Sequence, residues 1–381
     1  MLASDQFGGE NEYVIPYRNT KALADLSRNS NFKVLGPSPE LISAIDDNLY
    51  VFSELSRRGI LQPKGKIVIS STLETLERNP ITLPHVLKCR TSASGSGCYF
   101  INNETQLQHF QNEFLGEPLL LSEFISGISL NIHGVITESE LHMSAPSIQL
   151  VGISECAERA EIYCGNDYAA VEQVSTDIIT SVREQTEYVG KWLSSIGYTG
   201  IFGVDFVANR DGAYVVDVNP RFQGSTSLLT QLELKAGSIT TVEKHISHYL
   251  GETPTFNIEQ PKRFEKKEVS KFLRGAQIIL HLLNKAPVEI SGGVSSGIYS
   301  FENNVLSFVR EGVSVLECRS PMEFALTCAV PLGGTKILPN APLAKLVFPR
   351  SVVDSSFRRL QPDISALTRA IYRQLLSPTI L

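Results

Sequence analysis

Apolar and polar positions follow a helical period in some stretches of the chain and a strand period in others. Helical spacing predicts helices over residues 20–27, 39–58, 73–78, 105–114, 175–196, 225–250 and 363–376. Short apolar or alternating runs predict strands over residues 33–35, 66–70, 85–89, 98–101, 119–124, 130–136, 141–145, 201–208 and 213–218. Helices and short strands that alternate without a regular strand–helix–strand rhythm predict an α+β fold rather than a doubly wound parallel sheet.

The length of 381 residues predicts more than one domain. The helical pattern ends near residues 251–261, whose composition is typical of a loop, and short strands with glycine-rich turns are predicted after it. We therefore expect a domain boundary there and a β-rich α+β domain over residues 256–381.

Charge and cysteine use exclude several classes of protein. The net charge is -6 and no block of Lys and Arg occurs, which argues against a duplex nucleic-acid binder. The densest basic stretch, residues 262–271, is interleaved with Glu265 and Glu268, as on a solvated helix face. No apolar run is long enough to span a membrane. The six cysteines form no C-x-x-C pair, which predicts a cytoplasmic protein without a zinc or redox motif.

Residues 203–221 carry the most informative pattern. Two β-rich runs flank Arg210–Gly212, and a three-residue hairpin loop would pair Asn209 with Ala213 and therefore Asp205 with Asp217. Asn219 shares the face of Asp217. Two carboxylates and an amide oxygen at one point predict a Mg²⁺ site.

The same hairpin has a plainer interpretation, with its polar side simply in water. A two-residue loop would also shift the register and move Asp205 to the other face. If the strand continues past Pro220, Arg221 extends the candidate face toward a phosphate or a developing anion.

Residues 91–97 are seven small residues in a row, Thr-Ser-Ala-Ser-Gly-Ser-Gly. Backbone N–H groups in such a loop can cradle phosphate oxygens, and Lys88 on the preceding strand supplies a positive charge. Taken alone, the composition favours a flexible hairpin loop without a ligand; the phosphate-binding interpretation gains weight only because the carboxylate hairpin follows. The segment is not a Walker A loop, since no Gly-Lys-Ser/Thr follows.

Together these segments resemble the ATP-grasp superfamily, which includes D-alanine–D-alanine ligase and biotin carboxylase. The resemblance covers about residues 34–250 and rests most on the Asp…Asp-x-Asn-x-Arg pattern of residues 205–221. It implies a reduced N-terminal region over residues 1–38, an ATP-grasp domain over 39–255 with a flap subdomain over about 66–124, and a C-terminal domain over 256–381.

The resemblance also implies the roles of individual residues. The metal ligands would be Asp205, Asp217 and Asn219, and the catalytic residues Arg221 and Lys88. The residues that bind ATP would be Lys88, Ser94, Gly95, Ser96, Gly97, Glu123, Phe124, Ile125, Ser129 and Asn48. Asn48, Ser122 and Ser129 stand where relatives often carry a charged residue; each keeps a polar group that can form a hydrogen bond.

The implied activity is that of a ligase that uses ATP and one or two Mg²⁺ ions. A carboxylate, from an amino acid or a peptide, is activated as an acyl phosphate and joined to an amine, giving an amide, ADP and phosphate. Two alternatives stay open: acylation of a carrier-protein thiol, and a non-catalytic nucleotide-binding scaffold. The expected partners are small-molecule substrates, with a carrier protein or a second subunit as further candidates, and neither nucleic acid nor membrane.

The acceptor site is weakly marked by the sequence. Gln149, Arg159 and Asn166 are candidate contacts, although a surface or turn role explains each at least as well. His133 and His142 are expected to be structural. His245 and His248 share a helix face but lack a third ligand nearby, which argues against zinc.

Overall fold

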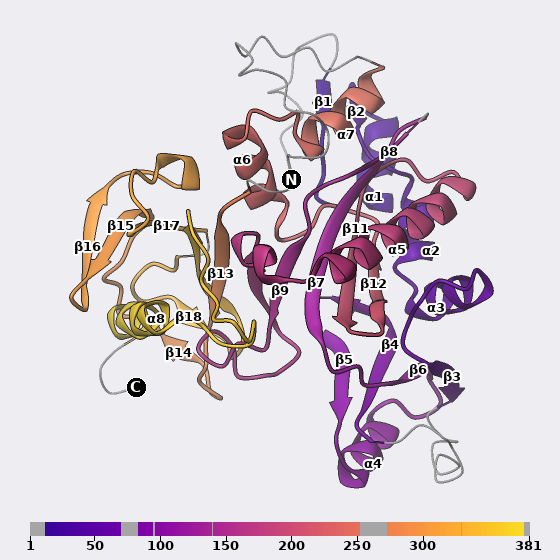
Figure 1. Ribbon diagram of the computed structural model, residues 1–381, viewed down its shortest axis with the longest axis horizontal. Coiled ribbons are helices and arrows are strands. Elements are labelled where there is room, and N and C mark those ends of the chain that lie inside the picture. Colours follow the sequence, from indigo (N-terminus) through magenta and orange to yellow (C-terminus); the bar gives the residue numbers. More distant parts are fainter. Residues whose placement is uncertain are drawn as a thin grey trace.

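The computed structural model describes residues 12–69, 83–93, 96–138, 140–251, 273–328 and 330–376. Two large antiparallel sheets, one of eleven strands and one of four, dominate this part of the chain (Figure 1). Helices cover both, so the predicted α+β class is confirmed. No helix in the described ranges is long and apolar enough to cross a membrane.

The large sheet runs through most of the molecule. Its strands follow the order β12, β11, β7, β9, β10, β13, β19, β17, β15, β16, with β8 paired to β7. The bounds are β7 Ile128–Ile136, β8 Leu141–Met143, β9 Ser147–Val151, β10 Tyr163–Asp167, β11 Gly200–Asn209, β12 Gly212–Asn219, β13 Ala276–His281, β15 Gly297–Glu302, β16 Val305–Arg310, β17 Glu323–Thr327 and β19 Pro342–Phe348. The sheet therefore continues from β10 into β13, past the predicted domain boundary, and the division into domains stays a prediction.

The smaller sheet forms the lower lobe in Figure 1. Its order is β3 Gly65–Ile69, β6 Pro118–Glu123, β4 His85–Ala93 and β5 Ser96–Ile101. Leu87, Ile101, Leu119 and Leu121 form a separate small core against α4 Glu104–Glu113. Two pairs of short strands complete the fold: β1 Glu12–Val14 with β2 Phe32–Val34, and β14 Val288–Glu289 with β18 Lys336–Ile337.

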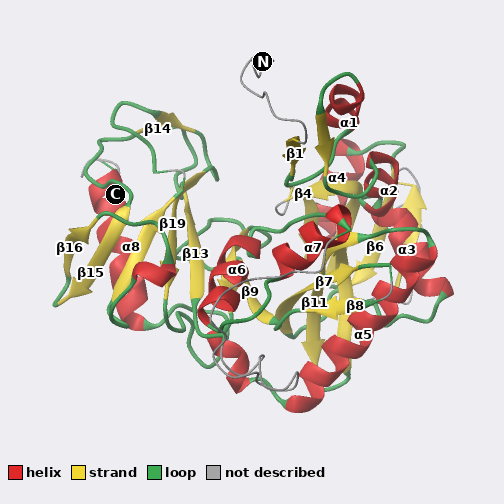
Figure 2. Ribbon diagram, turned by 90° about the horizontal axis from the view of Figure 1, so that it is seen from above, coloured by secondary structure: helices red, strands yellow, loops and turns green. Residues whose placement is uncertain are grey.

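Helices cover the large sheet on its apolar face. The helix α5 Thr176–Ser195 packs on β7, β11 and β12, and α8 Pro362–Leu375 lies by the other end of the sheet (Figure 2). Val182 and Val189 of α5 share the main core with Val204 and Phe206 of β11. Since side chains alternate along a strand, Asp205 must point to the opposite face. The further helices are α1 Lys21–Arg28, α2 Pro39–Ile45, α3 Asn48–Arg57, α6 Thr226–Lys235 and α7 Thr241–Leu250.

Four local predictions need correction. The helix expected over residues 225–250 is two helices, α6 and α7, separated by residues 236–240. The helix expected over residues 39–58 is two helices, because Asp47 caps α3 by accepting from the backbone N–H groups of Leu49 and Tyr50. The loop expected over residues 91–97 is shorter, since β4 extends to Ala93 and β5 begins at Ser96. The strands β9 and β10 were not expected at all. The expected helix over 73–78 and the basic stretch over 262–271 lie outside the described residues.

Candidate functional site

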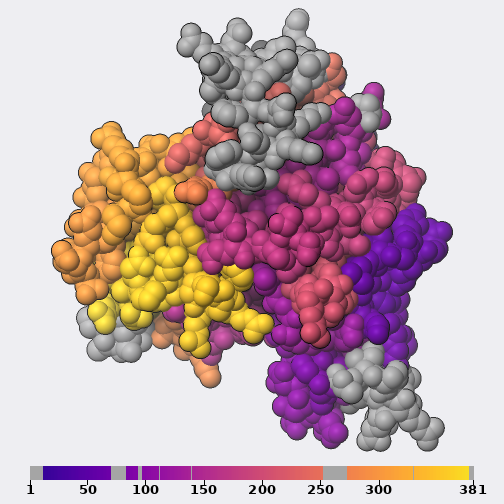
Figure 3. All heavy atoms as spheres, viewed as in Figure 1, coloured from indigo at the N-terminus to yellow at the C-terminus, as the bar shows by residue number. Residues whose placement is uncertain are grey.

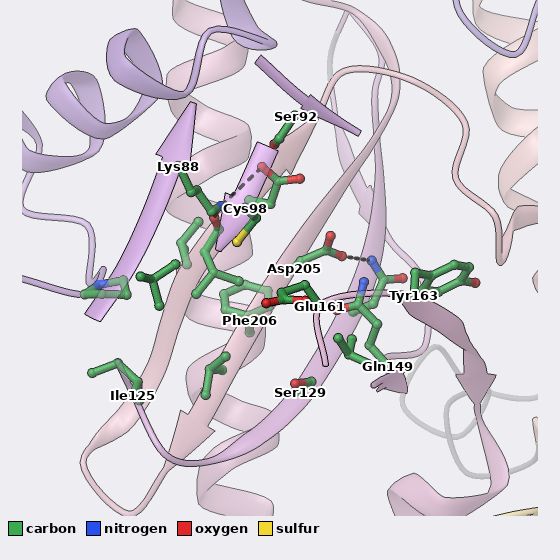
Figure 4. A pocket seen from close by; sticks show the side chains of 18 of the residues that line it. Lys88, Ser92, Cys98, Ile125, Ser129, Gln149, Glu161, Tyr163, Asp205 and Phe206 are labelled. Atoms are coloured by element: carbon green, nitrogen blue, oxygen red, sulfur yellow. Dashed lines mark hydrogen bonds and ion pairs between the residues drawn. The ribbon is translucent and has the colours of Figure 1, made fainter. Parts of the chain in front are cut away.

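A cavity of about 670 Å³ lies between the small sheet and the polar face of the large one. Figure 4 shows Lys88, Ser92 and Cys98 at one end, Ile125 and Ser129 at another, and Gln149 and Tyr163 on a third side. Asp205 lies in the middle of these groups. The cavity thus brings residues from both sheets and from distant parts of the sequence to one place.

The β11–β12 hairpin places two carboxylates opposite each other, by a different route from the expected one. Asn209 pairs with Gly212, not with Ala213, so the loop has two residues rather than three. With that loop and an unbroken ladder, Asp205 would pair with Val216. The register shifts between Asp205 and Phe206, however, because Val216 is an extra residue on β12 and forms a β-bulge. The predicted pairing of Asp205 with Asp217 is confirmed because this bulge restores it.

A set of side-chain amides surrounds Asp205. Its Oδ1 accepts from Asn131 Nδ2 at 2.5 Å and from Gln223 Nε2 at 3.5 Å. Its Oδ2 accepts from Asn219 Nδ2 at 3.2 Å, so it is the other polar atom of this amide, Asn219 Oδ1, that could bind a cation. Gly203 makes room for this arrangement, since a Cβ there would lie 2.0 Å from Gln223 Cδ.

The electrostatics of the carboxylate pair favour a cation. Burial, and then the charge of Asp217, raise the pKa of Asp205 to about 6. A positive ion placed between the two carboxylates would relieve both effects. Few hard oxygen ligands, with room left for water and phosphate oxygens, fit Mg²⁺. In the described ranges no three His, Cys, Asp or Glu side chains gather around one point, so this set of two carboxylates and an amide is the candidate.

Lys88 crosses from the small sheet to the hairpin. Its Nζ donates to the carbonyl oxygen of Val216, the bulged residue, and lies 3.8 Å from Asp217 Oδ1. Its side chain is mostly buried. The residue expected to meet the phosphates therefore lies directly beside the expected metal ligands.

The glycine-rich segment is described only in part. Ser94 and Gly95 lie outside the described residues, and Ser96 begins β5. Gly97 has φ +79, and a Cβ there would lie 2.9 Å from the Thr91 carbonyl oxygen, so this turn requires glycine. Ser92, which belongs to the run of seven small residues, and Cys98, which directly follows that run, both line the cavity.

The residues expected near the adenine and ribose of ATP all line the cavity, and we call them the adenine side: Ser122, Glu123, Phe124, Ile125 and Ser129. Glu123 exchanges bonds with Lys64, accepting at Oε1 from Lys64 N at 2.8 Å. Its side chain is thus engaged. Asn48 also lines the cavity, but its Nδ2 donates to Cys89 O at 2.9 Å and Ser92 Oγ at 3.1 Å. Asn48 therefore ties α3 to β4.

Arg221 lies beyond the end of β12 and is held by Tyr17. Its Nη1 donates to the Tyr17 hydroxyl at 2.8 Å and to the Phe222 carbonyl at 3.1 Å, and its guanidinium lies 5.4 Å from the centre of the Tyr17 ring. Both side chains line the cavity. Tyr17 was not singled out from the sequence, which gives no signal that an N-terminal residue reaches Arg221.

The third side of the cavity is a row of amides on the face that carries Asp205. Direct cross-strand pairs link Asp205 to Asn131, Asn166 to Gln149, and Asn166 to Gln277. Gln149 and Asn166, two of the candidate acceptor contacts, line the cavity, whereas Arg159 does not. Arg159 lies instead 3.5 Å from Glu161, which does line the cavity and was missed.

The histidines are used within the fold. His245 Nδ1 accepts from Ile201 N at 3.0 Å while Nε2 donates to Leu35 O at 3.1 Å, so both ring nitrogens have partners. His133 Nε2 contacts Thr226 Oγ1 at 3.1 Å in the buried core. His142 lies on the half-exposed strand β8, and its Nε2 is 3.3 Å from Glu140 Oε2. These contacts agree with the structural roles expected for His133 and His142.

Comparison with known proteins gives one family and several solved structures. Residues 45–225 match the model of the ATP-grasp domain. Carboxyaminoimidazole ribonucleotide synthase from Aspergillus clavatus, solved with ATP, is 15% identical with a TM-score of 0.61 over 94% of this chain and 82% of that one. Biotin carboxylase from Campylobacter jejuni is 14% identical with a TM-score of 0.59, covering 96% and 75%.

A third solved structure was determined with its ligands. It is the biotin carboxylase domain of 2-oxoglutarate carboxylase from Hydrogenobacter thermophilus, a dimer in complex with MgADP, ADP and bicarbonate. It is 17% identical with a TM-score of 0.58, and the match covers 89% of this chain and 70% of that one. At such identities the likeness establishes the fold.

Proposed function

We propose, from the premise that this chain is an ATP-grasp protein whose ATP-grasp domain includes residues 45–225, that it is an ATP-dependent, ADP-forming ligase. Its substrates would be a small carboxylate, from an amino acid or a peptide, and an amine. The products would be an amide, ADP and phosphate.

The observation that carries this proposal is the pairing of Asp205 with Asp217 beside Lys88. Like charges directly opposite each other on a sheet are destabilising. Both lie in a cavity, with an ammonium group 3.8 Å from Asp217. A site that only had to be stable would not keep two facing carboxylates, whereas a site for a metal-bound polyphosphate needs them.

The residues present fit Mg²⁺ and ATP. Asp205, Asp217 and Asn219 Oδ1 would hold one or two Mg²⁺ ions, which when bound neutralise phosphate charge. Lys88 would orient the phosphates by its ammonium group. The backbone near Glu123, Phe124 and Ile125 would take the adenine edge, while Asn48 and Ser129 contribute polar contacts.

Arg221 is the cation on the acceptor side of the carboxylates. It would hold the attacking carboxylate and then the oxygens of the acyl phosphate, and Tyr17 fixes its orientation. The wall beyond is mostly neutral, with Gln149, Asn166 and Tyr163, so it suits a polar, uncharged part of a substrate. Water must be kept away from an acyl phosphate, which favours a reaction inside a cavity over one on an open surface.

The test is release of ADP and phosphate from Mg-ATP in a panel of amino acids, short peptides and amines, with mass spectrometry of the products. ADP formed only with a particular carboxylate and amine, together with their dehydrated adduct, supports the proposal. If a thioester forms on an added carrier protein, the acceptor is a thiol and not an amine. Failure of the protein to bind Mg-ATP would overturn the proposal.

A further inference from the structure

A small hairpin near the C-terminus has an unusual backbone. Val353 and Leu360 form an isolated bridge, and Asp354 N donates to Arg359 O at 3.0 Å. Between them Phe357 has φ 59, the left-handed region that side chains with a Cβ rarely adopt. Strained non-glycine residues concentrate at functional sites, where surrounding contacts hold them.

The hairpin is held firmly at its tip and at its base. At the tip, Asp354 Oδ1 accepts from Ser356 N at 3.0 Å, and Phe357 N donates to Asp354 O at 3.1 Å. At the base, the buried Asp167 accepts at Oδ2 from Ser351 Oγ and Val352 N, each at 2.8 Å. The tip is therefore positioned by β10 as well as by its own turn.

This tip lines the same cavity as the candidate ATP site. Ser356, Phe357 and Arg358 line it, and Arg358 Nη2 lies 3.5 Å from Ser126 Oγ, next to the expected adenine side. In Figure 3 the C-terminal part of the chain, in yellow, packs directly against the magenta middle of the chain. More than two hundred residues of sequence separate the two contacting segments.

The charge of Arg358 is unused within the described part of the chain, where it forms no ion pair. Within the described residues, three cationic side chains line the cavity: Lys88, Arg221 and Arg358. Of the other two, Lys88 has its ammonium group committed to Val216 and Asp217. Arg221 is held by Tyr17 and is assigned above to the acceptor side, so Arg358 on the C-terminal hairpin is the remaining guanidinium of the described lining that could meet a nucleotide.

We propose that Arg358 is a nucleotide-binding residue, which the hairpin over residues 353–360 places on the ribose side of ATP, beside Ser126. This inference rests on the proposed function, since it assigns one wall of the same ATP site. The 3.5 Å contact of the guanidinium with Ser126 Oγ is weak, so it is readily exchanged for an oxygen of the nucleotide. The C-terminal domain thereby becomes part of the ATP site.

The test compares Arg358→Ala with Arg359→Ala in the full chain. Arg359 is the adjacent exposed arginine on the hairpin and does not line the cavity. Binding of a non-hydrolysable ATP analogue with Mg²⁺ is measured by calorimetry at low and moderate salt, with thermal unfolding as the check on folding. A third variant, Arg358→Lys, keeps the charge but loses the planar fork.

We expect Arg358→Ala to weaken binding about tenfold and to reduce its salt dependence, since one charge-assisted hydrogen bond is lost. Arg358→Lys should lie between, and Arg359→Ala should bind like the unmodified protein. Equal binding by Arg358→Ala and the unmodified protein would overturn this inference alone. If the unmodified protein binds no nucleotide, the proposed function and this inference fail together.

Discussion

Asp205 and Asp217 lie directly opposite each other although the hairpin between them has a two-residue loop. An unbroken ladder from that loop would place Asp205 opposite Val216. The bulge adds one residue, so that Asp217 faces Asp205 and the carbonyl of Val216 is left outside the ladder, where Lys88 binds it. The contact that holds Lys88 beside the two carboxylates therefore depends on a single extra residue.

Asp217→Asn should abolish Mg-dependent ADP formation, since one of the two anionic ligands is lost. It should also raise the free energy of unfolding of the ligand-free protein by up to about 1 kcal/mol, because like charges facing each other on a sheet repel. Steady-state ADP release and thermal unfolding measure the two effects. Asp211→Asn in the exposed turn of the hairpin is the matched control and should change neither. An active Asp217→Asn protein would show that the metal assignment is wrong.

Deleting Val216 tests what the bulge contributes. Without this residue a regular ladder from the two-residue loop still pairs Asp205 with Asp217, so Mg²⁺ binding should persist. Lys88 loses the displaced carbonyl, and we expect ATP affinity to fall about tenfold, comparable to loss of one charged hydrogen bond. Titration of Mg²⁺ and of the ATP analogue separates the two. Loss of both would mean that the deletion shifts the register of the whole strand.

The sequence was sufficient for the two strands of the hairpin, because their alternation is visible locally, but not for the length of its loop or for the bulge at Val216. It was not sufficient for the partners of Asp205. Asn131 lies on β7 and Gln223 in the loop after β12, and an isolated amide residue carries no signal for its distant partner. For the same reason Tyr17 could not be linked to Arg221.

The missed strands show a second limit. In β10 the buried residues include Asn166 and Asp167, so a buried strand has the composition of a loop. Polar residues are buried there because both faces have partners: Asn166 bonds to Ser147, and Asp167 anchors the base of the C-terminal hairpin. A search for alternating hydrophobic residues therefore misses a strand whose buried side chains are polar and are satisfied by hydrogen bonds.

Gly203→Ala should disturb the amide set around Asp205. The new Cβ would lie within 2.0–2.3 Å of the Gln223 side-chain amide, so Gln223 must move away from Asp205. We expect a loss of about 1–3 kcal/mol in stability from overpacking, together with a fall in ADP formation. Adding Gln223→Ala should restore much of the stability, because the clashing amide is removed, but not the activity. If the double variant is no more stable than Gly203→Ala, the clash is with another group.

Stability should fall as the pH falls from 7.5 to 5, in part because of His245. Burial lowers its pKa to about 4, against 6.5 in the unfolded chain, so the unfolded state binds more protons between these values. Protonation of Nδ1 would also place two N–H groups against each other, since Nδ1 accepts from Ile201 N. The stability from this group is therefore complete above pH 6.5 and is lost as the pH falls toward 4, by about 2 kcal/mol at pH 5. Urea unfolding at both pH values measures the difference.

The His245→Gln variant isolates this contribution to the pH dependence. It should be less stable than the unmodified protein at pH 7.5, because packing and two hydrogen bonds are disturbed. Its further loss on going to pH 5 should be smaller by about 2 kcal/mol, since no buried imidazole remains at this position to be protonated. His109→Gln on the exposed face of α4 is the control and should keep the full pH dependence. If His245→Gln loses as much stability between pH 7.5 and pH 5 as the unmodified protein, another buried histidine is responsible. His133, whose pKa is lowered to about 3 by burial, is the next residue to replace.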